Sequence, residues 1–325
     1  MHAGHRKTYT KMKLISFIIP VYRNEETLQA LHRQLNEVSI ELASKCDFEF
    51  IYIDDGSDDS SLKQLLSIQE IDPRVNVISF SKNFGQVAAL SCGLKEANGD
   101  AAILMAADLQ EPTSLISEMV ESWEQGNEIT IGYRSSREDG VIDKATSKFF
   151  YRLIKFSSTQ MPSGGFDFAF LDRKAVDALN QIKEKNRFLQ GDMLNIGYNV
   201  KFIPYKRQKS ASKNPSSSFS KRLKYFIDGI LNTSYLPIRL MSLLGVATAF
   251  AGFVYAGGIV YLKIAHQTPF KGWAPIMILI LIIGGLLMLM LGVIGEYLWR
   301  IYDEVRNRPN YIIKKKYVAE KEKTI

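Results

Sequence analysis

Three polar loops of the sequence carry residue types that can bind a charged ligand, and each follows a short apolar run. The first loop contains Pro20, Tyr22 and Glu25, of which Tyr22 offers a flat aromatic face and Glu25 an acceptor oxygen. The second contains the adjacent carboxylates Asp54 and Asp55, followed by a glycine that suits a tight turn. Such carboxylates can accept hydrogen bonds from a base N–H group or from ribose hydroxyls. Taken alone, either loop is also explained by a helix cap and a turn.

The third loop pairs a carboxylate with an amide two residues later, at Asp108 and Gln110. These oxygens can share a hard divalent cation, because Mg²⁺ takes one or two protein oxygens and completes its shell with phosphate oxygens and water. A pyrophosphate leaving group needs such a counter-charge, since negative charge develops on it as its bond breaks. The third loop therefore predicts a site for Mg²⁺ or Mn²⁺ at Asp108 and Gln110.

Short β-rich runs alternate with segments of helical spacing through the first two thirds of the chain. The β-rich runs cover residues 14–19, 48–53, 75–79, 101–105, 129–131, 166–171 and 201–204. Helical spacing covers residues 25–42, 60–71, 86–97, 113–125, 143–156 and 173–182, with caps expected at Asn24 and at Asp58 or Ser60. This alternation predicts an α/β fold with a parallel sheet and helices on both faces. Ligands of such sheets bind beyond the carboxyl ends of the strands, where the three polar loops lie.

The last third of the chain is predominantly apolar. Residues 241–261 and 276–295 are apolar and uncharged for about the length that crosses a bilayer, which predicts two transmembrane helices. A pair of buried core helices would explain the pattern only at an unusual length. Positive charges gather on the two flanks of this region, so both flanks are expected in the cytoplasm, as in a multi-pass hairpin of the inner membrane. Small residues along both runs permit a homo-oligomer.

The formal net charge of +7 is unevenly distributed, and residues 201–224 are rich in Lys and Arg without any acid. Such a block suits phosphates, an anionic membrane or nucleic acid, and a solvated loop is the simpler alternative. The neighbouring apolar run favours the membrane, and the lack of interleaved aromatic residues argues against nucleic acid. Residues 220–231 fit an amphipathic interfacial helix, although an ordinary surface helix fits equally well.

The cysteines Cys46 and Cys92 lack metal-ligand spacing and are expected to be reduced. Together these patterns predict a division of the chain into segments. They are a flexible leader at residues 1–13, an α/β domain at 14–205, a basic loop and interfacial helix at 206–239, a transmembrane hairpin at 240–299 and a basic cytoplasmic tail at 300–325.

Four motifs, in their order and spacing, resemble those of glycosyltransferase family 2, which has the GT-A fold. They are IIPVYRNEE, IDDGSDD, SKNFGQ and ADLQEP. With the two apolar runs and the tail GVIGEYLWRIYDEVRNRPNYIIK, the chain looks like the polyprenyl-phosphate glycosyltransferases, relatives of dolichyl-phosphate mannose synthase and of bacterial undecaprenyl-phosphate glucosyltransferases. The resemblance implies transfer of a sugar from a nucleotide sugar, UDP-linked by analogy, to polyprenyl (undecaprenyl) phosphate at the cytoplasmic membrane face. It also implies inversion at the sugar carbon.

The resemblance assigns roles to single residues. Nucleotide contacts are implied for Pro20, Tyr22, Glu25 and Asp54 or Asp55. Metal and diphosphate binding are implied for Asp108 and Gln110, phosphate binding for Arg134, and donor-sugar positioning for Asp167. Acceptor-phosphate binding is implied for Lys144, Ser147 and Lys148, at a helix N-terminus that suits phosphate in its own right. One departure is Ala106, where the family usually has another Asp, and it leaves a weaker metal site or an inactive protein open.

The acceptor determines whether a general base is needed. A phosphate monoester is already anionic at neutral pH, because its second pKa is about 6, and it can attack the anomeric carbon unaided. A hydroxyl acceptor would need a base, for which Asp192 matches the position of the family's usual carboxylate. Two alternatives therefore stay open: a membrane glycosyltransferase acting on a hydroxyl through Asp192, and an inactive nucleotide-binding membrane scaffold. The Gln-x-x-Arg-Trp motif of processive synthases does not occur in the sequence.

Overall fold

The chain divides into two compact units in the computed structural model, which describes residues 12–134, 162, 166–184, 187–206, 236–264, 274–306 and 308–318. The globular unit comprises Met1–Phe226 together with Pro309–Ile325, and the helical unit comprises Ile227–Arg308. The chain therefore leaves the globular unit, forms the helical unit and returns to complete the globular one.

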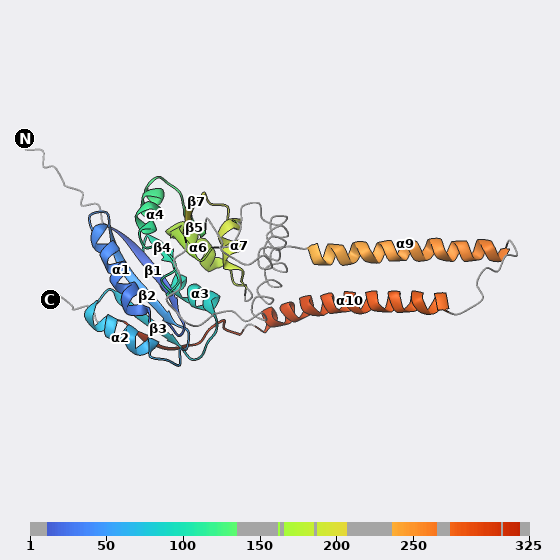
Figure 1. Ribbon diagram of the computed structural model, residues 1–325, viewed down its shortest axis with the longest axis horizontal. Coiled ribbons are helices and arrows are strands. Elements are labelled where there is room, and N and C mark those ends of the chain that lie inside the picture. Colours follow the sequence, from blue (N-terminus) through green and yellow to red (C-terminus); the bar gives the residue numbers. More distant parts are fainter. Residues whose placement is uncertain are drawn as a thin grey trace, which may run out of the picture. The chain divides into compact units, whose positions relative to one another are not determined.

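An eight-stranded sheet lies at the centre of the globular unit, in the order β7-β5-β6-β4-β1-β2-β3-β8 (Figure 1). Its strands are β1 (Lys13–Val21), β2 (Cys46–Asp54), β3 (Val75–Phe80), β4 (Ala101–Leu104), β5 (Ile129–Arg134), β6 (Phe168–Asp172), β7 (Val200–Tyr205) and β8 (Ile313–Tyr317). Neighbouring strands run parallel except where β6 or β8 takes part, and these two are antiparallel to their partners. The sheet is thus mostly parallel, as the sequence predicts.

Helices cover both faces of this sheet. They are α1 (Leu28–Glu41), α2 (Ser61–Ile71), α3 (Gln86–Glu96), α4 (Leu115–Glu124), α6 (Arg173–Gln181) and α7 (Leu189–Asn195). One core contains residues of α1, α2 and α4 with Phe17, and the other contains residues of α3, α6 and α7 with Ile18. Successive strand residues point to opposite faces, so β1 supplies both cores. The expected helix at 143–156 lies outside the described residues, and α7 was not predicted.

The expectations about helix caps are confirmed only in part. The N-cap residue of α1 is Thr27 and not Asn24, whereas that of α2 is Ser60, one of the two expected residues, and neither side chain bonds to the helix backbone. Asn24 Oδ1 instead accepts a hydrogen bond from the Tyr22 amide at 2.9 Å, and Asp58 pairs with Arg23. These polar side chains stabilise the loops rather than the helix ends, because the loops offer donors that compete with the first turn.

The two cysteines are free and buried, as expected. Burial raises the pKa of Cys46 and that of Cys92 to about 11 each, so both remain thiols at neutral pH.

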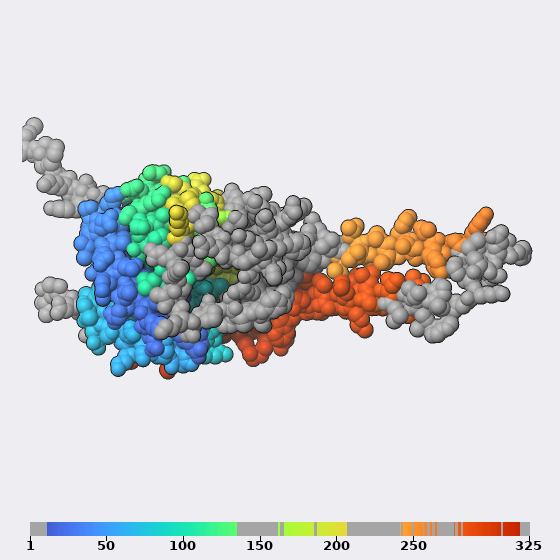
Figure 2. All heavy atoms as spheres, in the orientation of Figure 1, coloured from blue at the N-terminus to red at the C-terminus, as the bar shows by residue number. Residues whose placement is uncertain are grey.

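The helical unit contains α9 (Leu236–Ile264) and α10 (Ala274–Val305). Among the described residues, Ile282–Val305 is the helical stretch long and apolar enough to cross a membrane, and the apolar stretch of α9, Leu243–Tyr255, is shorter. Large apolar side chains such as Leu287 and Met288 are exposed on α10, the helix drawn in orange-red in Figure 2. The structure therefore supports one candidate span, and the second span and the hairpin stay predictions. Glu296 and Arg300, four residues apart on α10, form an ion pair at 3.3 Å.

Candidate functional site

The loops after β1 and β2 are joined at the carboxyl edge of the sheet. The guanidinium of Arg23 donates to both oxygens of Asp58, at 2.6 Å in each case. Glu25 Oε2 accepts a hydrogen bond from the amide of Ser60 at 2.8 Å, so this expected ligand acceptor already holds the second loop. Arg23 has a φ of 56°, a left-handed conformation that costs a non-glycine residue about 1–3 kcal/mol. The contacts between the loops hold it in that conformation.

Tyr22 is the most exposed of the expected nucleotide contacts. Its side chain is 39% exposed, whereas Asp54 and Asp55 are buried and Pro20, inside β1, is half-buried. The Arg23 guanidinium lies 5.3 Å from the centre of the Tyr22 ring. An exposed aromatic ring can stack on a base, so contact of Tyr22 with the nucleotide stays a prediction that its exposure allows.

Asp54 is fixed by donors of its own protein. Its Oδ1 accepts from the Ser57 amide at 3.1 Å, and its Oδ2 accepts from the Ser79 hydroxyl at 2.9 Å. Each carboxylate oxygen has a further lone pair, so a ligand contact remains open alongside this role in shaping the loop.

Asp55 holds the loop that follows β3. Its two oxygens accept from the amides of Phe84 and Gly85 at 2.6 and 2.8 Å. Burial raises the pKa of Asp55, and these two amides oppose that rise. Next to it Gly56 has a φ of 66°, and a Cβ on Gly56 would collide with the backbone of Lys82. The loop after β2 and the loop after β3 therefore touch through their backbones, which glycine alone permits.

The loop after β4 presents oxygen ligands at the same edge. Asp108 is half-buried, and its Oδ1 accepts a hydrogen bond from the backbone amide of Gln110 at 3.2 Å. Leu109 between them has a φ of 61°, another left-handed residue of the kind that gathers at functional sites. Gln110 is buried, and its Oε1 has no hydrogen-bond partner among the described residues. A buried oxygen that accepts no hydrogen bond, two residues from a carboxylate in the chain, is a suitable ligand for a divalent cation.

This cation would depend on few protein ligands. Across the part of the chain that the structure describes, no three His, Cys, Asp or Glu side chains are grouped to hold a metal. Ala106, at the position of the family's extra Asp, contributes no oxygen from its side chain. Asp108 and Gln110 would therefore share the cation with phosphate oxygens and water, in the way that Mg²⁺ is commonly bound.

Arg134 is the centre of a charged cluster at the end of β5. Its Nη2 lies 3.2 Å from Asp167 Oδ2, and its side chain is 13% exposed. Burial lowers the pKa of Arg134, but Asp167, Tyr205 and Glu111 together outweigh burial and raise it. The guanidinium is therefore charged at every physiological pH, and it can bind phosphate oxygens with two donors at once.

Two members of this cluster, Glu111 and Tyr205, were not predicted from the sequence. Tyr205 ends β7 directly opposite Arg134 in the parallel ladder of β5 and β7. Burial raises the pKa of the Tyr205 hydroxyl, and so does the charge of Glu111, while Arg134 lowers it. The register between β5 and β7 is a tertiary feature, so the sequence offered no signal for Tyr205. Glu111 stands inside the ADLQEP motif, where its polar type was the available signal.

Helix α7 supports Asp167 and contains Asp192. The Gln190 amide donates to the carbonyl of Phe166 and lies 3.4 Å from Asp167 Oδ1. Asp192 Oδ2 accepts from Arg187 Nε at 3.0 Å. Burial raises the pKa of Asp192, and Arg187 opposes the rise. The structure thus brings Arg134, Asp167 and Gln190 together and engages Asp192 in a separate ion pair.

The expected acceptor-phosphate residues Lys144, Ser147 and Lys148 lie outside the described residues, as do the basic loop from residue 207 onward and residues 220–231. Their proposed roles stay predictions.

Comparisons with known proteins agree with the arrangement of these loops. Residues 16–179, which include the three polar loops, Arg134 and Asp167, match the sequence model of Glycosyl transferase family 2. The uncharacterized glycosyltransferase YkcC of Bacillus subtilis is 36% identical over 94% of both chains. An uncharacterized glycosyltransferase of Synechocystis is 35% identical over 92% of this chain and 94% of its own. The SfII prophage-derived bactoprenol glucosyl transferase of Shigella flexneri is 31% identical over 93% of this chain and 98% of its own.

Proposed function

Because the chain belongs to glycosyl transferase family 2, we propose that it transfers a sugar from a nucleotide sugar to polyprenyl phosphate. The donor is UDP-linked, the acceptor is undecaprenyl phosphate, and the product is a polyprenyl-phosphate-linked monosaccharide formed with inversion. The name of the Shigella relative supports a polyprenol acceptor, since bactoprenol is a polyprenol and the similarity runs through nearly all of both chains.

The observation that carries this proposal is the cluster of charged and oxygen-bearing side chains at the carboxyl edge of the sheet. The loop after β4 carries the carboxylate of Asp108 and the buried amide oxygen of Gln110, and β5 ends with the guanidinium of Arg134. A nucleoside diphosphate needs this combination, because its charge requires cationic partners and oxygens that share a metal.

The donor would be held by its base, its diphosphate and its sugar. The ring of Tyr22 stacks on the base, and Arg134 binds the diphosphate with two N–H donors. Asp108 and Gln110 would hold Mg²⁺ or Mn²⁺, whose positive charge would balance that of the diphosphate. Asp167, fixed by Arg134 and Gln190, faces the sugar. These residues orient the donor and stabilise the charge that develops on the leaving group.

The acceptor phosphate needs no general base. Its second pKa is about 6, so an anionic oxygen is available to attack the anomeric carbon at neutral pH. Lys144, Ser147 and Lys148 would bind this phosphate. Asp192 pairs with Arg187 and is not required for a phosphate nucleophile.

The lipid acceptor also explains the helical unit. Two spans, of which Ile282–Val305 is the longer apolar stretch, would hold the catalytic domain at the cytoplasmic face of the inner membrane. The chain would thus be a multi-pass membrane protein, and its segments would follow the boundaries predicted from the sequence.

The decisive test compares two acceptors that differ in one group. The purified full chain in detergent is given radiolabelled UDP-sugars and Mg²⁺ or Mn²⁺, with undecaprenyl phosphate in one reaction and undecaprenol in the other. We expect a labelled lipid from the phosphate alone, and Asp192→Asn should leave its formation within about threefold of wild type. Labelling of undecaprenol that disappears in Asp192→Asn would instead establish the hydroxyl-acceptor reaction. If neither lipid becomes labelled, the result would favour an inactive scaffold.

A further inference from the structure

The segment that follows α10 in the chain packs against the loop that Asp55 binds. Tyr311 stacks on Phe80, the last residue of β3, with ring centroids 5.0 Å apart and planes 7° from parallel. Phe80 contacts Phe84 edge to face at 5.8 Å. The Phe84 amide then donates to Asp55 Oδ1 at 2.6 Å. Direct contacts between neighbours therefore lead from Tyr311 to Asp55.

Backbone pairing holds the same loop at its first residue. Strand β8 lies antiparallel to β3, with Ile313 opposite Phe80, and the ladder shifts its register between Ser79 and Phe80. Just beyond this irregularity the Ser81 amide donates to the carbonyl of Ile312 at 3.0 Å. The loop of residues 81–85 thus begins with a hydrogen bond to the C-terminal segment and ends with hydrogen bonds to Asp55.

Side chains on both sides of β8 anchor it to the globular unit. The ammonium of Lys316 lies 2.7 Å from both carboxylate oxygens of Glu96, at the end of α3. The side-chain amide of Gln69, on α2, donates to the carbonyl of Tyr317 and to that of Val75, at 2.8 Å each. These anchors lie away from the loop of residues 81–85, at the far end of α3 and on α2, so β8 is held independently of its contacts with that loop.

We propose that Tyr311 is a positioning residue for the donor nucleotide. It supports Phe80 and Phe84, and thereby keeps the amides of Phe84 and Gly85 on Asp55, next to the close backbone contact of Gly56 with Lys82. This inference rests on the proposed function, because it assumes that the loops after β2 and β3 bind the nucleotide. Loss of the Tyr311 ring would release the loop and weaken nucleotide binding without altering the acceptor side.

The test compares three variants of the full chain in detergent. Tyr311→Leu removes the ring that stacks on Phe80, and Tyr311→Phe keeps that ring and removes the hydroxyl. Tyr317→Leu is the matched control, because Tyr317 belongs to the same C-terminal segment and ends β8 opposite Val77, away from the loop. The measurements are the Kd of UDP, hydrogen exchange of the peptide covering residues 81–86, and the KM for undecaprenyl phosphate.

Tyr311→Leu should raise the Kd of UDP by about tenfold and speed exchange of the loop, with the KM for the lipid within about twofold of wild type. Tyr311→Phe and Tyr317→Leu should behave as wild type in both the UDP and the exchange measurement. The inference is overturned if Tyr311→Leu binds UDP as wild type does, or if Tyr317→Leu has the same effect. UDP binding and exchange are read without acceptor, so failure of wild type to glycosylate undecaprenyl phosphate would count against the proposed function alone.

Discussion

Asp167 Oδ2 lies 3.2 Å from Arg134 Nη2, although the two residues flank strands that run in opposite directions. Arg134 ends β5, whereas Asp167 directly precedes β6. Because β6 is antiparallel to both of its neighbours, its amino end lies beside the carboxyl ends of β4 and β5. In a sheet of parallel strands, this edge would carry only residues that follow a strand. Because β6 is reversed, the edge also carries Asp167, a carboxylate that precedes its strand.

The Arg134–Asp167 pair should be essential for transfer. Arg134→Lys keeps the charge but loses the two-pronged donor, and kcat/KM for the nucleotide sugar should fall by about 10- to 100-fold. Asp167→Asn should cost about tenfold, because the guanidinium loses its charged partner. Arg173→Lys is the control, since Arg173 lies on α6 and bonds the carbonyl of Ala97. Steady-state kinetics that show Arg134→Lys equal to the control would remove Arg134 from the site.

Asp108 should be needed for chemistry and not for folding. Asp108→Asn keeps the size of the side chain and removes its charge, so transfer should fall by about 100-fold or more while Tm stays within about 2 °C. Glu121→Gln, an exposed carboxylate on α4, should leave both quantities unchanged. Activity measured over a range of Mn²⁺ concentrations would show whether added metal compensates. Full activity of Asp108→Asn would exclude a role in catalysis.

Gly56→Ala should destabilise the loops more than a positive φ alone explains. The φ of 66° costs an alanine about 1 kcal/mol, and the collision of its Cβ with Lys82 adds to this, for a total of about 2–4 kcal/mol. Gly126→Ala separates the two effects, because Gly126 has a φ of 94° with open space around its Cβ position. Unfolding in urea measures both changes. Equal losses for the two variants would show that the backbone contact of Gly56 contributes nothing.

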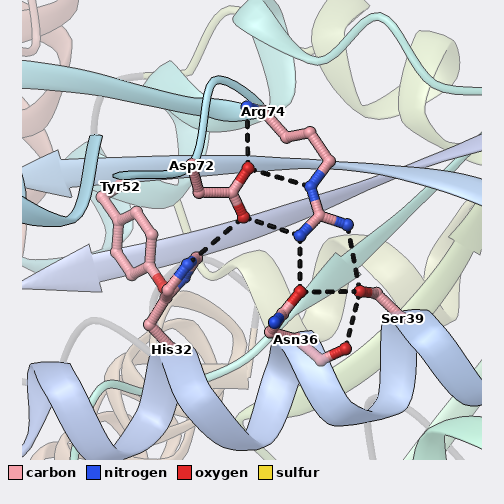
Figure 3. A network of polar contacts seen from close by, with 6 residues as sticks. All are labelled: His32, Asn36, Ser39, Tyr52, Asp72 and Arg74. Atoms are coloured by element: carbon pink, nitrogen blue, oxygen red, sulfur yellow. Dashed lines mark hydrogen bonds and ion pairs between the residues drawn. The ribbon is translucent and has the colours of Figure 1, made fainter. Parts of the chain in front are cut away.

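A partly buried polar network joins α1 to the residues that precede β3, and Figure 3 shows its members. Arg74 donates to both oxygens of Asp72 at 2.9 and 2.7 Å, and also to Asn36 Oδ1 at 2.6 Å. The ring of His32 lies between the Tyr52 hydroxyl and Asp72, at 3.1 and 3.3 Å. Burial raises the pKa of Asp72, but the hydrogen bonds from His32 and Arg74 outweigh burial and hold that pKa well below its usual range.

Stability should therefore fall in acid through Asp72. A carboxyl group whose pKa is lowered by folding contributes its full stabilisation at pH values above its pKa in the unfolded chain, about 3.9. This contribution is lost as the pH falls below about 3.9 towards the lowered pKa of the folded protein. Asp72→Asn should lose about 2–4 kcal/mol at pH 7 and show a smaller further loss between pH 5 and 2 than wild type.

Asp58→Asn is the control for this measurement. Its pair with Arg23 is exposed to solvent, which screens the attraction, so the change in stability should be small at every pH. Tm measured against pH would contradict the prediction if Asp72→Asn and wild type followed parallel curves.

Much of the sheet could be predicted because its strands are covered on both faces and read as continuous apolar runs. Residues 75–79 were expected as a strand, and β3 extends over Val75–Phe80. Strand β8 could not be found in this way. Its sequence contains Lys314, Lys315 and Lys316, which are exposed on an edge strand, and its partner β3 is distant in the chain. Edge strands commonly carry lysine, so their composition resembles that of a loop.

Four positions of the candidate site could be named from motifs in the sequence, whereas Tyr205 could not, and the roles of these residues stay predictions. Asp108, Gln110, Arg134 and Asp167 all follow from motifs in the sequence, and the structure places them at the carboxyl edge of the sheet. Tyr205 depends on the register between β5 and β7, which no local pattern encodes.

The return of the chain to complete the sheet has a consequence for biosynthesis. Strand β8 follows both long helices in the chain, so the sheet must wait for its final strand until the helices have emerged from the ribosome. Until then β3 is an unpaired edge, open to wrong partners in other nascent chains. A chain cut short before residue 309 would therefore be released with that edge uncovered.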